Sequence, residues 1–144
     1  MITDGYLDAI GARLVAGRPL RADDHAGAMP VVLADERLAD RYFGGDALGR
    51  RIRSIGGKDW TIVGIVRNIQ HGAITEADEP ALYYPSRQVG EILAYSRLSG
   101  GVAVRSTGEP TSLAPAIREI VRELSPEYPV FNVMPLADRL AATF

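Results

Sequence analysis

A short strand followed by a capped helix is the sequence feature that most restricts the fold of this chain. Residues 30–34, Pro-Val-Val-Leu-Ala, form a continuous apolar run of the length expected for a buried strand. Asp35 follows at the place of a helix N-cap, because its carboxylate can accept a hydrogen bond from a first-turn amide. Apolar residues then recur at helical spacing up to Phe43, and Gly44–Gly45 supplies the permissive backbone that ends a helix. The segment is predicted to be a β–α unit.

The middle of the chain is predicted to be rich in strands. Residues 51–55 and 59–67 read as two strands joined by a turn at Gly56–Gly57. The second strand has strongly strand-prone residues: Trp60, Ile62, Val63, Ile65 and Val66. Residues 80–85 form a short extended segment with a proline at each end, which favours an edge strand. Residues 86–100 are interpreted as a loop or a short helix.

The last third predicts a strand, an amphipathic helix and a second strand. Val102 and Val104 mark the first strand, and residues 129–133 form the second. Between them, residues 109–112 start a helix with an apolar stripe that we expect to face the core, made of Leu113, Ile117, Ile120, Val121 and Leu124. This order is a βαβ unit with parallel strands. If another strand lies between them, the arrangement is ferredoxin-like.

Both ends of the sequence read as helices. Thr3–Asp4 is a candidate N-cap for a first helix, whose apolar positions are Tyr6, Leu7, Ile10 and Leu14. Residues 135–144 predict a last helix with Pro135 near its first turn. Because both ends lie within predicted helices, the sequence is expected to be a segment of a longer protein.

The predicted fold class is therefore α/β (α+β). We expect a mixed sheet built from βα and βαβ units with helices on one face, plus a small β-rich inserted lobe. A chain of 144 residues buries about two-thirds of its surface on folding, which suits one domain with such an insertion.

Composition and charge exclude several classes of protein. The net charge of −2 does not indicate the positively charged surface that nucleic-acid binding requires. The absence of cysteine excludes disulfide scaffolds, thiolate zinc sites and cysteine nucleophiles. The longest stretch without a charged residue, residues 128–137, is about half the ~20 residues that a membrane-spanning helix needs. No charged-then-apolar signal segment opens the sequence.

The candidate catalytic and metal-binding residues are few. Asp23, Asp24 and His25 are possible metal ligands by type, but their spacing is not that of a helix face, and the segment reads as a solvated turn. His71 lies in a polar loop with Glu76 and Glu79, where it could act as a general base. No nucleophile or orienting partner accompanies it. The sequence predicts no catalytic, cofactor-binding or metal-binding residue.

The glycines and arginines also fail to form a recognisable anion site. Gly44–Gly45 precedes a strand, whereas a phosphate loop needs its glycine turn to open a helix. Arg50, Arg51 and Arg53 could contact an anion, yet alternation along a strand would divide them between two faces.

The segments at residues 31–43, 47–52 and 61–69 together resemble one family, the MacB-like periplasmic core domains of ABC-transporter permeases in the FtsX-like superfamily. Residues 31–43, VVLADERLADRYF, are similar to the family's VVVINEALARRYF. Residues 47–52 resemble its PIGKRI, and residues 61–69, TIVGIVRNI, its EIVGVVGDV. Weaker matches occur in family order at residues 5–7, 14–20, 84–85, 104–110, 124–126 and 129–130. Asp35 stands where the family usually has asparagine, and the usual proline after Phe43 is missing.

The resemblance implies a non-catalytic function on the extracytoplasmic, periplasmic face of the membrane. In the family, an ABC ATPase subunit or domain hydrolyses ATP, and membrane helices of the permease transmit the movement to a periplasmic domain that engages a partner protein or a lipophilic or peptide substrate. By analogy, residues 1–45 and 100–144 form a βα lobe and residues 46–99 a β-rich insertion. The portion that normally precedes this segment in the family is absent from the sequence.

Two other functions stay open on the sequence alone. One is a small soluble hydrolase-like enzyme that uses the loop of His71 and residues 76–79, and the other is a cytoplasmic ferredoxin-like ligand-sensing domain. An open sheet edge would also favour a homodimer, because an unpaired edge can add strands of a second copy. Light scattering at high concentration tests that expectation.

Overall fold

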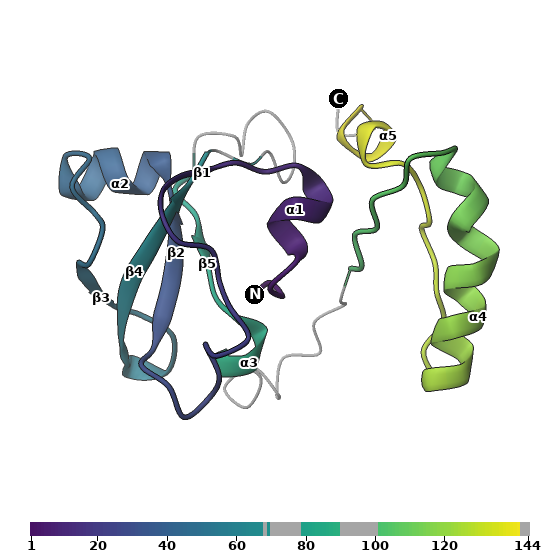
Figure 1. Ribbon diagram of the computed structural model, residues 1–144, viewed down its shortest axis with the longest axis horizontal. Coiled ribbons are helices and arrows are strands. Elements are labelled where there is room, and N and C mark those ends of the chain that lie inside the picture. The colour runs from purple at the N-terminus through teal and green to yellow at the C-terminus, as the bar shows by residue number, and fades with distance from the viewer. Residues whose placement is uncertain (68, 70–78, 90–100, 142–144) are drawn as a thin grey trace. The chain divides into compact units, whose positions relative to one another are not determined.

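The computed structural model describes residues 1–67, 69, 79–89 and 101–141 (Figure 1). Contacts within the chain divide it into two compact units. Unit 1 comprises Met1–Ile69 and Asp78–Ala103, and unit 2 comprises Gln70–Ala77 and Val104–Phe144. None of the helices in the described ranges combines the length and the apolar character that crossing a bilayer requires.

Unit 1 is built on a mixed five-stranded sheet. The strands are β1 (Leu14–Gly17), β2 (Val31–Asp35), β3 (Arg51–Arg53), β4 (Asp59–Val66) and β5 (Leu82–Tyr83). The sheet order is β1-β4-β2-β5, and β3 pairs with the first half of β4. β2 and β4 are parallel neighbours, whereas the other pairs are antiparallel. The sheet confirms the predicted mixed α+β class.

The central βαβ unit of the sheet follows from local sequence signals. β2 leads directly into α2 (Glu36–Phe43), and the chain returns through β3 to β4, which lies beside β2. Asp35 caps the helix, its Oδ1 accepting a hydrogen bond from the Leu38 amide at 2.8 Å. Gly44 ends the helix in the left-handed conformation, with φ of 58°. The predicted β–α unit at residues 30–45 is confirmed.

The strand β2 is buried along its whole length because both faces of the sheet are covered. Val32 and Ala34 join the core cluster that contains Leu38 and Ala39 of α2. On the opposite face, residues of β2 and β4 join a second cluster that contains a leucine of α1 (Tyr6–Ile10), and its members are Ile2, Leu7, Leu20, Val31, Leu33, Val66 and Tyr83. Figure 1 likewise draws α1 and α2 on opposite sides of the strands. The expected one-sided helical layer therefore has a counterpart, the short helix α1, on the other face.

The helix α1 is shorter than predicted. It has no side-chain cap, and its N-cap residue is Gly5 rather than Thr3 or Asp4. Gly11 adopts φ of 72° and ends the helix, with the Ala12 amide donating to the Leu7 carbonyl at 2.8 Å. Leu14, expected on this helix, instead opens β1. The left-handed glycine overrides the helical spacing of the apolar residues.

The two predicted strands of the middle segment and the edge strand are confirmed. β3 and β4 are antiparallel and joined through a short 3-10 turn, Ile55–Gly57. β5 lies at the sheet edge beside β2. Beyond β5, Ile2 forms a parallel bridge with Pro85, in which the Ile2 amide donates to the Tyr84 carbonyl at 2.8 Å. The short helix α3 (Ser86–Val89) follows, and residues 90–100 of the predicted loop or helix lie outside the described residues.

Unit 2 contains α4 (Ala114–Leu124), which follows a 3-10 turn at Pro110–Leu113, and α5 (Leu136–Ala141). The predicted helices at 109–124 and from residue 135 are confirmed. The predicted strands at 102–104 and 129–133 are wrong, because neither segment pairs as a strand among the described residues. Local strand preference does not suffice where no neighbouring strand supplies the hydrogen bonds.

The apolar stripe of α4 is not a core face in the described part of the chain. Ile120 is 55% exposed and Leu124 is 78% exposed, whereas Leu113, Ile117 and Val121 are half-buried. The prediction that this stripe is buried is therefore wrong in part. The shorter stripe of α2 is buried at Leu38 and Ala39, whereas Tyr42 is exposed, with the Arg41 guanidinium 5.9 Å from its ring centroid. Helical periodicity identifies an apolar face without showing what covers it.

The strands of the middle segment share a sheet with strands from the first part of the chain. β3 and β4, from within residues 46–99, pair with β1 and β2. The contacts thus place residues 14–66 in one unit. The division into a βα lobe (1–45 and 100–144) and an insertion (46–99) stays a prediction drawn from the family analogy.

Candidate functional site

The loop between β1 and β2 is closed by a partly buried ion pair. Asp24 is 5% exposed, and both of its carboxylate oxygens accept hydrogen bonds from the Arg18 guanidinium at 2.8 Å. The Arg21 amide donates a third hydrogen bond to this carboxylate at 2.8 Å. These bonds, that of Arg18 first, hold the pKa of Asp24 below its ordinary value, against the opposing effect of burial. The carboxylate is thus fully engaged in fixing the loop.

The structure does not bring Asp23, Asp24 and His25 together as metal ligands. Asp24 faces Arg18, and the exposed His25 accepts a hydrogen bond at Nδ1 from the Gly27 amide at 3.2 Å. In the described ranges, no group of three or more histidine, aspartate or glutamate side chains has an arrangement that could hold a metal ion. The segment is a turn, as predicted, but it is not wholly solvated, because Asp24 is buried against Arg18.

A buried glutamine fastens the other end of the same loop. Gln88 of α3 accepts a hydrogen bond at Oε1 from the Val31 amide at 3.0 Å. Its Nε2 donates to the His25 carbonyl at 3.2 Å and to the Met29 carbonyl at 3.0 Å. One side chain therefore satisfies three backbone groups at the entry to β2, which fixes the position of the loop against α3.

A buried tyrosine lies next to the N-cap of α2. Tyr83 of β5 is 4% exposed, and burial raises the pKa of its hydroxyl well above the ordinary value. The nearby Asp35 carboxylate raises that pKa further. Tyr83 is thus neutral at physiological pH, and Asp35 uses its carboxylate to cap α2. Both groups serve the packing of β2 and β5.

We expect the Asp24–Arg18 pair to make stability depend on pH in the acid range. Because the folded-state pKa of Asp24 is lowered, its contribution is complete above the unfolded value of about 4 and is lost as pH falls through the folded value. Asp24→Asn should lower the free energy of unfolding at pH 7 by about 2 kcal/mol, since Arg18 loses its charged partner. Urea unfolding from pH 7 to pH 2 measures this, and the difference from the parent chain should shrink below about pH 4.

Asp23→Asn is the matched control, because it removes the same charge from an exposed neighbour of Asp24. Its effect at pH 7 should stay within about 0.5 kcal/mol. Equal losses in the two variants, or a loss for Asp24→Asn that is constant between pH 7 and pH 2, would contradict the assignment.

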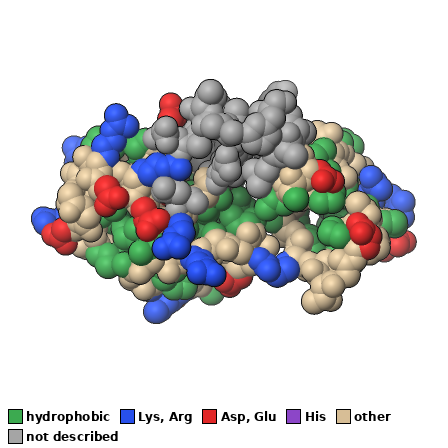
Figure 2. Space-filling model, turned by 90° about the horizontal axis from the view of Figure 1, so that it is seen from above, with side chains coloured by type: hydrophobic (Ala, Val, Ile, Leu, Met, Phe, Trp, Pro, Cys, Tyr) green, Lys and Arg blue, Asp and Glu red, His purple; other side chains and the backbone are tan. Residues whose placement is uncertain are grey.

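The arginines near β3 do not form a common anion site. Arg50 pairs with Asp46 at 2.6 Å, and Arg53 pairs with Asp59 at 3.1 Å. Arg51 and Arg53 lie two residues apart on β3, whose middle residue Ile52 packs toward the core. The face drawn in Figure 2 likewise shows basic and acidic side chains side by side over unit 1. The arginines are mostly used in local ion pairs.

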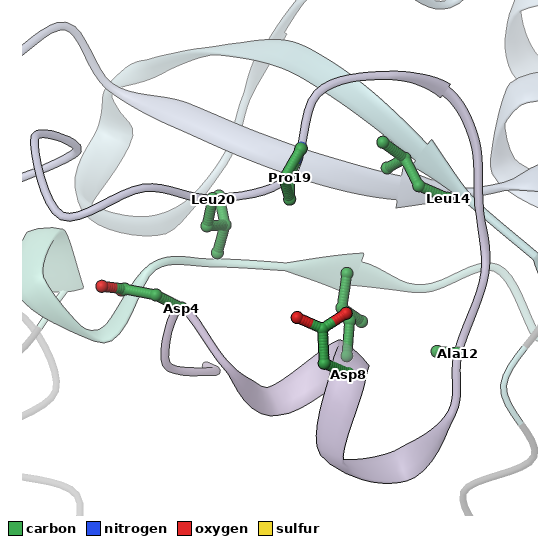
Figure 3. A pocket seen from close by; sticks show the side chains of 7 residues that line it. Asp4, Asp8, Ala12, Leu14, Pro19 and Leu20 are labelled. Carbon is green, nitrogen blue, oxygen red and sulfur yellow. The ribbon is translucent and has the colours of Figure 1, made fainter.

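A pocket of about 260 Å³ lies beside α1 in unit 1 (Figure 3). Its apolar lining comes mainly from three leucines, and its lining residues are Asp4, Leu7, Asp8, Ala12, Leu14, Pro19 and Leu20. Figure 3 shows the Asp8 carboxylate extending from α1 toward the segment that carries Pro19 and Leu20. Asp4 interacts with Arg87 at 3.4 Å. The lining combines these apolar side chains with the carboxylates of Asp4 and Asp8, so it offers a place to bind a small, partly apolar group.

The loop proposed for the enzyme alternative lies almost entirely outside the described residues. His71, Glu76 and Asp78 belong to the range that the structure does not describe, and Glu79 at its end is exposed. Neither the hydrogen bonds of Gln88 nor the pocket beside α1 is predicted from the sequence. Both depend on contacts between segments that are far apart in the sequence, and no local pattern indicates them.

Comparison with known proteins decides the family. The profile of the MacB-like periplasmic core domain family matches residues 1–123. The chain belongs to that family. The resemblance predicted from the sequence motifs is thereby confirmed. A search of curated proteins finds no match to this chain.

Two solved structures share the fold of this chain. The chain is similar to the periplasmic region of MacB from Actinobacillus actinomycetemcomitans, with 22% identity and a TM-score of 0.59, over 85% of this chain and 54% of that one. It is also similar to the extracellular domain of the noncanonic ABC-type transporter YknZ from Gram-positive bacteria, with 16% identity and a TM-score of 0.57, over 93% and 67% of the two chains. The chain spans about half the length of the MacB periplasmic region.

Proposed function

We propose that the chain is a non-catalytic extracytoplasmic domain of an ABC-transporter permease. It couples ATP-driven movement of membrane helices to substrate export or to the engagement of a partner protein. The observation that carries this proposal is the family match over residues 1–123. The fold shared with the periplasmic region of MacB and with the extracellular domain of YknZ supports it.

The internal bonding of unit 1 suits a body that transmits movement. Its buried polar side chains hold the backbone: Asp24 closes the β1–β2 loop, Asp35 caps α2, and Gln88 fastens the entry to β2. Among the described residues, no buried side-chain nitrogen or oxygen lacks a hydrogen-bond partner. A body with satisfied interior groups and a sheet packed on both faces resists deformation under load.

The first test is the full gene that encodes this chain. We expect apolar stretches of about 20 residues on both sides of the domain, together with an ATPase domain that is fused or encoded nearby. A reading frame with neither flanking stretch would contradict the proposal.

The second test follows movement in the assembled transporter. The chain has no cysteine, so spin labels can be attached at introduced cysteines without removing native ones in this domain. Labels at Arg51→Cys in unit 1 and Glu123→Cys in unit 2, both exposed sites, give a distance between units. That distance, measured by electron paramagnetic resonance, should differ between the nucleotide-free and ATP-bound states.

The matched control pair is Arg51→Cys with Asp23→Cys, since both sites lie in unit 1. Its distance should be the same in the two nucleotide states. A transporter that hydrolyses ATP while neither distance changes would contradict coupling through movement of this domain's units. A change confined to the control pair would contradict the stiffness of unit 1.

A further inference from the structure

Unit 2 contains a second pocket, which lies along the second half of α4. Its volume is about 240 Å³, and it lies between the helix and the segment that follows it, which returns beside α4 in Figure 1. The lining residues are Arg118, Arg122, Pro126, Tyr128, Pro129 and Val130. Whole-ligand sites usually occupy about 300–1,000 Å³, so this pocket suits one charged group of a ligand.

The wall opposite the helix is held in place by a hydrogen-bonded turn. The Ser125 amide donates to the Val121 carbonyl at 2.8 Å, and the Tyr128 amide donates to the Ser125 carbonyl at 3.1 Å. Pro126 occupies the second position of this turn, and Pro129 follows directly after it. Because proline fixes its own φ, the backbone of this turn is locally restricted also without a ligand.

Arg118 and Arg122 are the charged side chains of this pocket's lining, whereas the carboxylates of Glu119, Glu123 and Glu127 neighbour them in the sequence outside the lining. Arg118 and Arg122 are four residues apart, so they lie one above the other on the same side of α4 and repel each other. Arg122 reaches Glu119 at 3.7 Å, a long contact on the exposed helix surface. Within the described ranges, Arg118 has no ion-pair partner, unlike Arg18, Arg50 and Arg53 of unit 1.

We propose that this pocket binds the carboxylate or phosphate group of a ligand. Arg118 is the main contact, since Arg122 in the last turn also offsets the partial negative charge at the end of α4. Guanidinium groups bind such planar or tetrahedral anions by charge-assisted hydrogen bonds, and the Tyr128 hydroxyl can donate another. A bound anion also relieves the repulsion between the two arginines. The site rests on unit 2 alone and is independent of the proposed coupling function.

Inorganic phosphate, titrated at constant ionic strength into the ¹⁵N-labelled 144-residue chain, is the first probe, and acetate is the second. We expect saturable chemical-shift changes at residues 118–122 and 126–130. Arg118→Gln should weaken phosphate binding about tenfold, the loss expected for one charge-assisted hydrogen bond. Arg118→Gln with Arg122→Gln should abolish the shifts. Circular dichroism checks that α4 persists in these variants.

The control is Arg51→Gln, which removes the same charge from an exposed arginine of unit 1 and should leave phosphate binding unchanged. Shifts that survive in the double variant, or that Arg51→Gln reduces equally, would overturn the site.

Vesicles distinguish the source of the anionic group. Sedimentation with phosphatidylcholine vesicles, with and without phosphatidylglycerol, tests a lipid headgroup. Binding that requires phosphatidylglycerol and is lost in the double variant supports the site and assigns it to lipid phosphate. Saturable binding of soluble phosphate or acetate without vesicle binding supports the site for a soluble ligand. If neither probe nor vesicle binds, the proposal is wrong.

Discussion

Trp60→Ala is expected to lower the free energy of unfolding of unit 1 by about 4 kcal/mol. Trp60 is 1% exposed and lies in the core cluster beneath α2. Its ring meets the Tyr84 ring edge-on, with centroids 4.9 Å apart, and its Nε1 donates to the Ile55 carbonyl at 3.1 Å. Alanine would leave a large cavity, remove the aromatic contact and leave that carbonyl without its partner.

Chemical denaturation followed by circular dichroism measures this loss, because the substitution removes the chain's one tryptophan as a fluorescent reporter. Trp60→Phe is the matched control. It keeps most of the buried ring and loses the indole N–H, so its cost should be about 1–2 kcal/mol. A loss below about 1 kcal/mol for Trp60→Ala would show that the residue does not pack as described.

Gly64→Ala is expected to cost about 3 kcal/mol through overpacking at the point where β1 and β4 meet. Gly64 faces Gly17 across the two strands. A Cβ on Gly64 would lie 2.9 Å from Leu33 Cδ2 and 3.0 Å from Leu14 Cδ1, and it would also overlap the Arg18 carbonyl. The leucines can shift by a rotamer, whereas the carbonyl belongs to the backbone that leads into the Asp24 loop. The strands must therefore separate or the loop must move.

Gly101→Ala is the control for Gly64→Ala, because a Cβ at Gly101 meets no atom of the described part of the chain within 4 Å. We expect its effect on the free energy of unfolding to stay within about 0.5 kcal/mol. Hydrogen exchange locates the damage: Gly64→Ala should speed exchange at the β1 amides first. Equal stability of the two alanine variants would contradict the close approach of β1 to β4.

The parts of the fold that the sequence predicts are those determined by neighbours in the chain. The cap at Asp35, the helix α2 and its glycine stop lie within about a dozen residues, and each uses a local hydrogen bond. The β3–β4 pair is likewise joined by a short turn. The motifs that match the family lie on these same elements. The same residues therefore predict both the family and the local structure.

The parts that the sequence misplaces depend on distant partners. Residues 102–104 and 129–133 have strand-prone side chains, but a strand exists only where another strand supplies its hydrogen bonds. The stripe of α4 has the right period, yet period alone does not bury Ile120 or Leu124. At α1, the local conformation of Gly11 decides the end of the helix against the apolar spacing.

The candidate sites are predicted from the sequence even less than the fold is. Gln88 binds backbone groups 57 to 63 residues away, a pattern with no local signature. The pocket of α4 needs the returning turn at Ser125–Tyr128 to place its wall opposite Arg118 and Arg122. Both arginines are visible in the sequence, but on an amphipathic helix they read as an ordinary solvated face.

The uneven burial of the two units has a consequence for how the protein melts. The buried apolar residues lie almost entirely in unit 1, and beyond residue 104 Ala114 is the one that the described residues contribute. Unit 2 therefore has little to hold its helices together cooperatively, and its amides should exchange with solvent far faster than those of β2. Trp60 reports on unit 1 alone. A fluorescence melt and a circular dichroism melt of the same sample will give different midpoints, and neither is the stability of the whole chain.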